Sequence, residues 1–249
     1  MSKKTENVSI DDALAETGYG KFNYFVIVIS GMILINVILE CTGLCFVLPV
    51  INCDMDLSYQ KKGILGAVSF LGMICSSHLW GFLADTTGRR NVIRPTLIAG
   101  YLVTVMSSFS PNFWTLTILR FVNGFLLSAG SATVFAYLGE FHCNYLRNRA
   151  LMSSAFISAA SAIFFPLSAW AVINQNWSFE IPIIHLTYTP WRMYILLVGT
   201  PGLICGLSLF FLPESPKYLL SIGKEKAAME ILRKIYSINT GKSRNSFNT

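Results

Sequence analysis

The sequence predicts an all-α membrane protein with six membrane-spanning helices. Apolar residues make up 53% of its 249 positions, whereas charged residues make up only 13%. Soluble domains carry about 25% charged residues, so a chain of this composition cannot bury its apolar side chains and still cover a water-exposed surface. The apolar residues also gather in six long runs, each sufficient for a helix that crosses the bilayer core, which takes about 20 residues.

Each apolar run is expected to be a helix, because an isolated strand would leave its backbone amides and carbonyls unpaired in lipid. Pro166 and Pro201 lie inside two of the runs and are expected to kink or begin helices without ending the spans. The expected spans, in chain order, are residues 22–47, 63–84, 91–109, 113–139, 150–172 and 191–212.

The chain divides into three parts. Residues 1–21 are a polar N-terminal tail without the short apolar stretch of a cleavable signal peptide, residues 22–212 contain the bundle, and residues 213–249 form a linker. The linker is expected to contain a short amphipathic helix that lies against the protein or the membrane surface. Its apolar positions have the spacing of one helix face: Ala228, Ile231, Leu232, Ile235 and Tyr236.

Basic residues predict the orientation of the bundle. If both termini are cytoplasmic, fifteen of the nineteen Lys and Arg residues lie on the cytoplasmic side, as expected when positively charged segments stay inside. Lys61, Lys62 and Arg192 would then lie outside, and Arg120 lies within a span. We therefore expect cytoplasmic N- and C-termini, in either a plasma membrane or an intracellular vesicle membrane.

An acceptor pattern for N-linked glycosylation lies in the expected outer loop between spans five and six. Asn176 is followed by Trp177 and Ser178, which satisfies the Asn-x-Ser/Thr pattern. A second such pattern begins at Asn7, but the predicted orientation places it in the cytoplasm, where it would stay unmodified. Asn176 is therefore the candidate for glycosylation.

A polar motif, G-x-x-x-D-x-x-G-R-R, joins spans two and three. Gly81 would let a second helix approach closely, and Gly88 would permit a tight turn. Asp85 would accept hydrogen bonds from the N-terminus of a neighbouring helix, whose partial positive charge favours an anion. Arg89 and Arg90 would hold the turn at the cytoplasmic surface and pair with acids.

This motif resembles the signature of the major facilitator superfamily, although Thr86 stands where the family usually has a basic residue. Two further stretches, one after span four and one after span six, resemble sugar-porter-type motifs. The resemblance implies the N-terminal six-helix bundle of the major facilitator fold, with a cytoplasmic gate closed by ion pairs; the alternative is that these residues only fix topology and fold. The implied gate residues are Gly81, Asp85, Gly88, Arg89, Arg90, Glu140, Arg147 and Glu214.

Shorter stretches from about residue 18 to 236 narrow the resemblance to synaptic vesicle glycoprotein 2 and its relatives, a branch near the organic cation and anion transporters. A general sugar porter is the weaker fit. The stretches are residues 20–22, 46–49, 62–66, 79–81, 177–179 and 191–192. The resemblance implies a small-molecule or ion substrate, with an organic solute favoured, held between two six-helix halves. The partners it implies are the lipid bilayer and a C-terminal half that this chain lacks.

Two charged residues lie deep within predicted spans: Glu40 in span one and Arg120 in span four. Both fall about 10 Å below the outer boundary at a rise of about 1.5 Å per residue, and a charge at this depth usually faces a cavity or a partner. Since the family's spans one and four line a central cavity, we expect the two side chains to face it and to be coupled, directly or through water. Glu40 would then be a proton or cation site. A purely structural pair is the alternative, because relatives often carry an acid where this chain has Val37.

Nothing in the sequence supports enzymatic activity. It contains no phosphate-binding loop, no Ser/His/Asp arrangement and no metal cluster, and its six cysteines show neither a disulfide framework nor zinc spacing. We expect no cofactor, no metal and no nucleic-acid partner. Three hypotheses for function remain: part of a full secondary transporter working by alternating access, a short form that pairs with another half or with itself, and a non-transporting vesicle or membrane glycoprotein with a trafficking or regulatory role.

Overall fold

The computed structural model describes residues 9–55, 57–182 and 186–247. Lys3, Lys4 and the acceptor pattern at Asn7 therefore lie outside the described residues. The elements, in chain order, are α1 (Ile10–Glu16), α2 (Lys21–Met55), α3 (Tyr59–Thr87), α4 (Arg89–Ser108), α5 (Phe113–Glu140), α6 (Asn144–Ser161), α7 (Phe164–Ile173), β1 (Phe179–Ile181), β2 (Leu186–Tyr188), α8 (Pro190–Ser208), α9 (Pro216–Ser221), α10 (Glu225–Thr240) and a short 3-10 helix (Arg244–Ser246).

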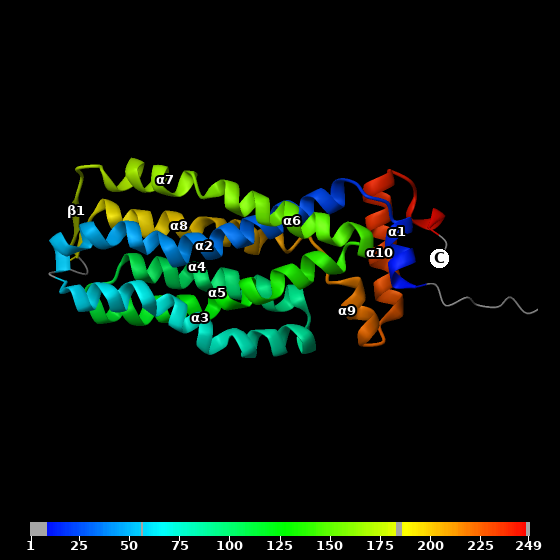
Figure 1. Cartoon of the computed structure of the whole chain (residues 1–249), viewed down its shortest axis with the longest axis horizontal. Helices are drawn as coiled ribbons and strands as arrows, with labels where there is room; N and C mark the ends of the chain where they lie inside the picture. The colour runs from blue at the N-terminus through cyan, green and yellow to red at the C-terminus, as the bar shows by residue number, and fades with distance from the viewer. Residues whose placement is uncertain (1–8, 56, 183–185, 248–249) are drawn as a thin grey trace, which may run out of the picture.

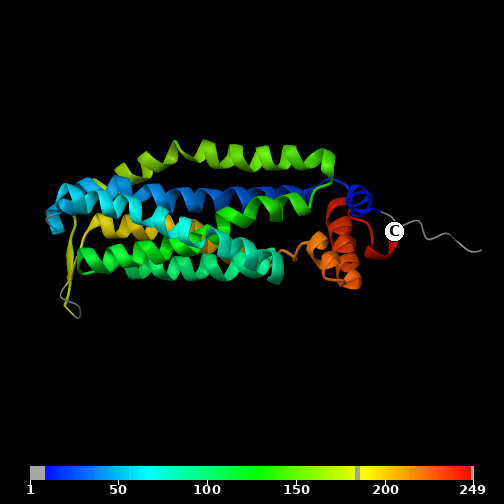
Figure 2. The same cartoon turned by 60° about the horizontal axis from the view of Figure 1, so that its bottom comes forward.

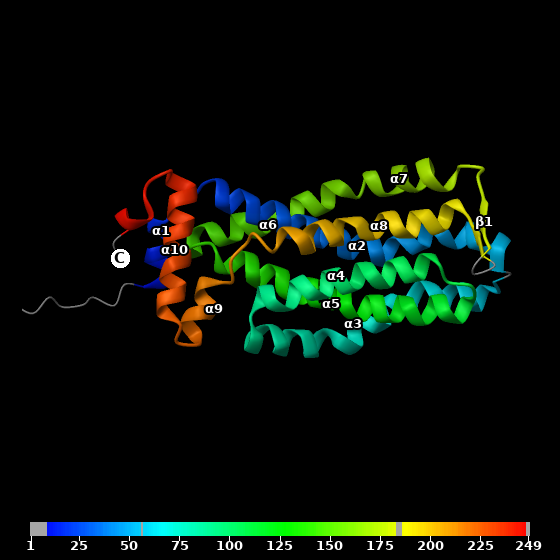
Figure 3. The ribbon, with the colours of Figure 1, turned by 180° about the vertical axis from the view of Figure 1, so that it is seen from behind.

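The long helices lie side by side along the length of the molecule (Figures 1 and 3). Helices α1 and α10 lie at one end of the bundle, called here the terminal end, and the β1–β2 hairpin lies at the other, called here the hairpin end. Within the described residues, five segments are long and apolar enough to cross a membrane. They are Lys21–Ile51, Tyr59–Thr87, Phe113–Glu140, Asn144–Ile173 and Pro190–Ser208.

The remaining predicted span is α4, which is less apolar than the other five. Its first two turns contain Arg89, Arg90 and Arg94, and these charges lower its mean hydropathy. It nevertheless packs between α5 and α8 as part of the same bundle (Figure 3). The protein is thus an all-α membrane protein in which α4 completes the six-helix arrangement.

The fifth predicted span consists of two helices. Helix α6 ends at Ser161 and α7 begins at Phe164, with Pro166 at its third position, where a missing backbone amide costs little. Pro201 lies inside α8, which stays continuous. Helix α2 also passes its internal proline, Pro49, and continues to Met55, whereas the sequence led us to end this span at residue 47.

Helices α3 and α5 cross at glycines. A Cβ added at Gly124 in α5 would fall on the backbone of Ser69 in α3. A Cβ added at Gly72 in α3 would likewise fall on the backbone of α5. Small residues at such crossings let two helix backbones approach closely in lipid. The approach also lets Trp80 Nε1 donate a hydrogen bond of 2.6 Å to the carbonyl oxygen of Phe125, so α3 and α5 are joined by polar contacts as well as by packing.

A helical cap formed by α1, α9 and α10 closes the terminal end (Figure 2). Helix α10 buries its apolar face, and Asn239 near its end donates to the carbonyl oxygen of Gly18 at 2.9 Å and accepts from the amide of Phe22 at 3.0 Å. Asn239 thereby satisfies an otherwise free amide in the first turn of α2. Asp11 in α1 pairs with Lys217 in α9 at 2.8 Å, so the cap joins both terminal regions to the bundle.

Candidate functional site

Glu40 in α2 and Arg120 in α5 form an ion pair inside the bundle. Arg120 Nη1 lies 2.9 Å from Glu40 Oε2, and the side chains are only 1% and 2% exposed respectively. The two residues that the sequence placed at one depth are thus in direct contact. Burying two charges costs hydration free energy, which is offset when further hydrogen bonds satisfy the remaining polar atoms.

A chain of hydrogen bonds holds the second oxygen of Glu40. The Thr104 hydroxyl in α4 donates to Glu40 Oε1 at 2.5 Å and accepts from Asn123 Nδ2 in α5 at 2.6 Å. Asn123 also donates to the carbonyl oxygen of Gly100 at 3.2 Å. Because a hydroxyl has a single proton, the Asn123 amide leaves the Thr104 proton free to point at the carboxylate. Helices α2, α4 and α5 therefore meet at one acidic side chain.

Helix α8 lies on the fourth side of this group of polar side chains, which we call the polar chamber. The group consists of Asn36, Glu40, Thr104, Arg120 and Asn123. A Cβ added at Gly199 would come within 2.8 Å of Glu40 Oε1, and one at Gly202 would come within 2.8 Å of the Asn36 amide. Asn36 lies one turn before Glu40 on the same face of α2. Glycines at these two positions leave the room that the polar side chains of α2 occupy.

Four buried polar atoms around the ion pair have no hydrogen-bond partner among the described residues. Two are acceptors, Asn36 Oδ1 and Asn123 Oδ1, and two are donors, Nε and Nη2 of Arg120. Unsatisfied buried groups cost about 1–3 kcal/mol each. These free donors and acceptors could bind water or a small polar group once a movement of the helices makes room for it.

The ion pair is enclosed by the bundle. The sequence led us to expect that Glu40 and Arg120 face an open central cavity, but α2, α4, α5 and α8 surround them and almost no surface is exposed. The physical reason is that two opposite charges cost less in an apolar environment when they neutralise each other away from lipid. Solvent or solute can therefore reach Glu40 only if helices of this bundle move.

A second group of charges lies at the terminal end, where α3 turns into α4. Arg89 Nη2 lies 2.8 Å from Asp85 Oδ1, and Arg89 Nε lies 3.0 Å from Glu140 Oε1. The Asp85 side chain is 71% exposed, against 16% for Glu140, so the pair with Glu140 is the better shielded from water. Gly88 forms the turn with a φ of 103°, a conformation that favours glycine.

Glu214 caps the N-terminus of α4. Its carboxylate accepts from the backbone amides of Arg90 at 3.1 Å and Asn91 at 3.3 Å, where the helix dipole favours an anion. We had expected Asp85 to bind a helix N-terminus, but its partner here is Arg89. The Arg90 side chain extends to the carboxyl end of α8. These contacts tie the α3–α4 turn to the chain that follows α8.

Two of the predicted gate residues stand apart from these contacts. Among the described residues Arg147 forms no ion pair; it lies over Gly139, where an added Cβ would come within 2.7 Å of Arg147 Nε. No neighbouring group within the described ranges lies within 4 Å of a Cβ added at Gly81. The contacts at the terminal end therefore include five of the six charged residues suggested by the sequence, all except Arg147.

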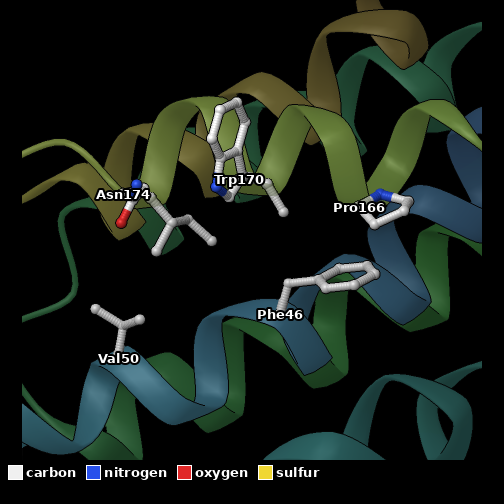
Figure 4. A pocket seen from close by; sticks show the side chains of 7 residues that line it. Phe46, Val50, Pro166, Trp170 and Asn174 are labelled. Atoms are coloured by element: carbon white, nitrogen blue, oxygen red, sulfur yellow. The ribbon is translucent and has the colours of Figure 1, made fainter.

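An open groove of about 340 Å³ lies between α2 and α7 (Figure 4). Phe46 and Val50 contribute from α2, while Pro166, Trp170 and Asn174 contribute from α7 and its end. None of the described residues that line the groove is charged, so it offers apolar and aromatic surface without an ion pair. It shares no lining residue with the polar chamber between α2, α4, α5 and α8.

Sequence reasoning missed most of the neutral members of the polar chamber. Asn36 and Asn123 carried a usable signal, since they lie four and three residues from Glu40 and Arg120 and hence on the same helix faces. Thr104 carried no such signal, because a threonine in a membrane helix often bonds to its own backbone. Gly199 is recognised as a chamber residue only once α8 is seen against α2.

The arrangement of the six helices and the match of residues 23–242 to the Major Facilitator Superfamily show that this chain belongs to that family of membrane proteins. The chain is 29% identical over 225 residues to synaptic vesicle glycoprotein 2B of Mus musculus and 30% identical over 227 residues to synaptic vesicle glycoprotein 2A of Rattus norvegicus. These matches cover 90% and 91% of this chain but 33% and 30% of the relatives. The chain thus spans about a third of their length.

Solved transporter structures share the fold. One is the proton:xylose symporter XylE bound to 6-bromo-6-deoxy-D-glucose, with a TM-score of 0.73, 17% identity, and coverage of 86% of this chain and 50% of that one. Another is a bacterial homolog of the human lysosomal transporter Spinster in an inward-facing, unoccupied conformation, with a TM-score of 0.69, 17% identity, and coverage of 80% and 44%. At these identities the likeness concerns the fold alone.

Proposed function

We propose that this chain is one six-helix half of a secondary active transporter that moves a small organic solute by alternating access. Membership of the Major Facilitator Superfamily supports transport as the class of function. In such transporters the solute is held between two halves. The partner half would be the remainder of a longer protein, a second copy of this chain or a different half.

The observation that carries the proposal is the buried pair of Glu40 and Arg120. Protonation of Glu40 would leave the guanidinium of Arg120 uncompensated in an apolar environment, which is costly. Arg120 would then favour a helix arrangement in which it meets other acceptors, and the free carbonyl oxygens of Asn36 and Asn123 belong to the same chamber. Proton binding would thereby change the packing of α2 against α5. Because an ion that binds one helix arrangement better than another increases the population of the first, protonation would favour the rearranged state.

In this proposal the terminal end lies in the cytoplasm and the hairpin end lies outside the cell or in a vesicle lumen. The distribution of Lys and Arg supports this orientation. The pairs of Arg89 and the cap formed by Glu214 would then belong to a cytoplasmic gate that is closed when the solute site faces outward. The names of the curated relatives support a vesicle membrane as one location.

A second candidate function is that of a non-transporting vesicle membrane glycoprotein with a trafficking or regulatory role. The observation favouring it is that the relatives are named for a location and a modification, with no solute in the name. In that case the Glu40–Arg120 pair would be structural, holding α2 and α5 together.

Uptake by reconstituted protein separates the two functions. The chain is purified together with its partner half and placed in proteoliposomes, and accumulation of a panel of radiolabelled organic cations, organic anions and sugars is compared with that in empty liposomes. Transport predicts saturable accumulation of at least one compound. Failure of the whole panel, with protein shown to be folded and inserted, would contradict transport by this chain and favour the second function.

A further inference from the structure

We propose that Asn176 carries an N-linked glycan, presented at the hairpin end of the bundle. Asn176 lies between the end of α7 at Ile173 and the start of β1 at Phe179. The sequence supplies the acceptor pattern. Modification also requires that the asparagine and the serine of the pattern can be reached together, and the structure supplies the evidence on that point.

An aromatic stack lies beside the acceptor pattern. Trp177 and Phe179 stack with ring centroids 5.6 Å apart and planes inclined by 13°, and Phe179 stacks on Tyr188 at 5.3 Å. Asn176 and Ser178 flank Trp177 in the connection between α7 and β1. Both are exposed, and within the described residues neither side chain makes a hydrogen bond.

The aromatic stack is anchored to the ends of the bundle helices. Tyr188 is buried; its hydroxyl lies 2.7 Å from Ser108 Oγ at the end of α4, and its ring centroid lies 5.4 Å from that of Phe109. Asp54 near the end of α2 accepts from Trp191 Nε1 at 2.6 Å, which fixes the start of α8 beside the hairpin. The hairpin is therefore held against the ends of the bundle helices, while Asn176 and Ser178 remain exposed.

The modification is a group transfer from a polyprenyl-pyrophosphate-linked oligosaccharide, catalysed by the transferase of the host secretory membranes. Nδ2 of Asn176 attacks the anomeric carbon of the first sugar, and a C–N bond forms. The bond from that carbon to the pyrophosphate oxygen breaks, the polyprenyl pyrophosphate leaves with the bonding electrons, and the amide nitrogen loses one proton. A bulky hydrophilic glycan cannot enter the bilayer, so it would fix the hairpin end outside the cytoplasm.

To test the proposal, the full chain is expressed in a glycosylating eukaryotic cell. Its gel mobility is compared before and after treatment with peptide-N-glycosidase. The unmodified sequence should show one enzyme-sensitive shift. Asn176→Gln and Ser178→Ala should each lose it, whereas Ser178→Thr should keep it. Asn7→Gln is the matched control, because its acceptor pattern lies on the other side in the proposed orientation, and this variant should keep the shift.

Three outcomes would overturn the proposal. Loss of the shift in Asn7→Gln alone would place the tail, and not the hairpin, in the compartment of the transferase. If no shift is seen, a flexible Gly-Ser spacer is inserted after Ile173. A shift that appears only with this spacer would show that Asn176 in the unmodified sequence lies too close to the bilayer to be glycosylated. No shift with the spacer would show that Asn176 is not a glycosylation site. Each outcome leaves the uptake experiment on the proposed transport function unaffected.

Discussion

The guanidinium of Arg120 in α5 lies 2.9 Å from the carboxylate of Glu40 in α2, eighty residues earlier in the chain. The same carboxylate accepts from Thr104 in α4, and Gly199 in α8 leaves room for it. Four helices of the bundle therefore meet at one acid. A change in the charge of Glu40 acts on the packing of all four, which makes this pair the most informative target for mutation.

Removing one partner of the ion pair is expected to destabilise the bundle more than removing both. Arg120→Met or Glu40→Gln alone leaves the other group without its partner, a loss that costs about 3–5 kcal/mol for buried pairs. The double variant contains neither charge and should recover part of that loss. Thermal unfolding midpoints of the three variants in detergent give a double-mutant cycle, and strictly additive losses would contradict a coupled pair.

The crossing of α3 and α5 should not tolerate a side chain at Gly124. A Cβ added at Gly124 would fall on the backbone of Ser69, so Gly124→Ala forces the two helices apart. The free energy of unfolding should fall by about 1–3 kcal/mol or more, as is typical of overpacked sites. Gly100→Ala in α4 is the matched control, because no neighbouring group in the described part of the chain lies within 4 Å of its added Cβ. Equal unfolding midpoints for the two variants would show that the crossing is not tight.

The two acids beside Arg89 should differ in their contribution to stability. Asp85 is 71% exposed, and exposed pairs of this kind contribute about 0–1 kcal/mol, so Asp85→Asn should change the unfolding midpoint little. Glu140→Gln removes the partner that is shielded from water and should lower the midpoint more. The order of the two midpoints in detergent checks this, and the reverse order would assign the principal pair to Asp85.

His142, just after α5, should make the folded state sensitive to acid. Burial lowers the pKa of this histidine below its ordinary value of 6.5, and its Nδ1 lies 2.8 Å from the carbonyl oxygen of Leu138. As pH falls through about 6.5, the unfolded chain takes up the proton before the folded one does, so the free energy of unfolding decreases. His142→Asn keeps a donor for Leu138 but does not titrate.

The measurement for His142 is the difference in unfolding midpoint between pH 7.5 and pH 5.5, conditions chosen to bracket its ordinary pKa of about 6.5. His142→Asn should show a smaller drop than the unmodified protein. His78→Asn, which removes an exposed histidine in α3, is the control and should behave like the unmodified protein. An undiminished drop in His142→Asn would assign the acid sensitivity to other groups.

Composition was sufficient to predict the long helices of the bundle, but α1, α9 and the β1–β2 hairpin were not predicted. Helix α5 spans Phe113–Glu140, close to the predicted residues 113–139, because Asn112 caps it by accepting from the amide of Thr115 at 2.9 Å. The break between α6 and α7 was not predicted, since apolar residues continue through it. Hydropathy reports whether a segment prefers lipid and contains little information on where the backbone bends.

The charged residues of the site were predictable, and their partners were less so. Glu40 and Arg120 stand out because charge is rare inside apolar runs. Pairing depends on how each helix is rotated about its axis, which the sequence does not specify. Arg147 was expected in an ion pair and lies over Gly139, while Asp85 was expected at the N-terminus of a neighbouring helix and pairs with Arg89. Enclosure of the ion pair by α8 depends on the same rotations.

Proton-coupled uptake shows whether protonation of Glu40 drives transport. Proteoliposomes containing the protein are given an inward proton gradient, and uptake of any solute that the panel identifies is followed with and without a protonophore. We expect that the gradient accelerates uptake, that the protonophore removes the acceleration, and that Glu40→Gln abolishes the pH dependence while Glu230→Gln, at an exposed acid on α10, retains it. An unchanged pH dependence in Glu40→Gln would contradict a role of Glu40 in proton coupling.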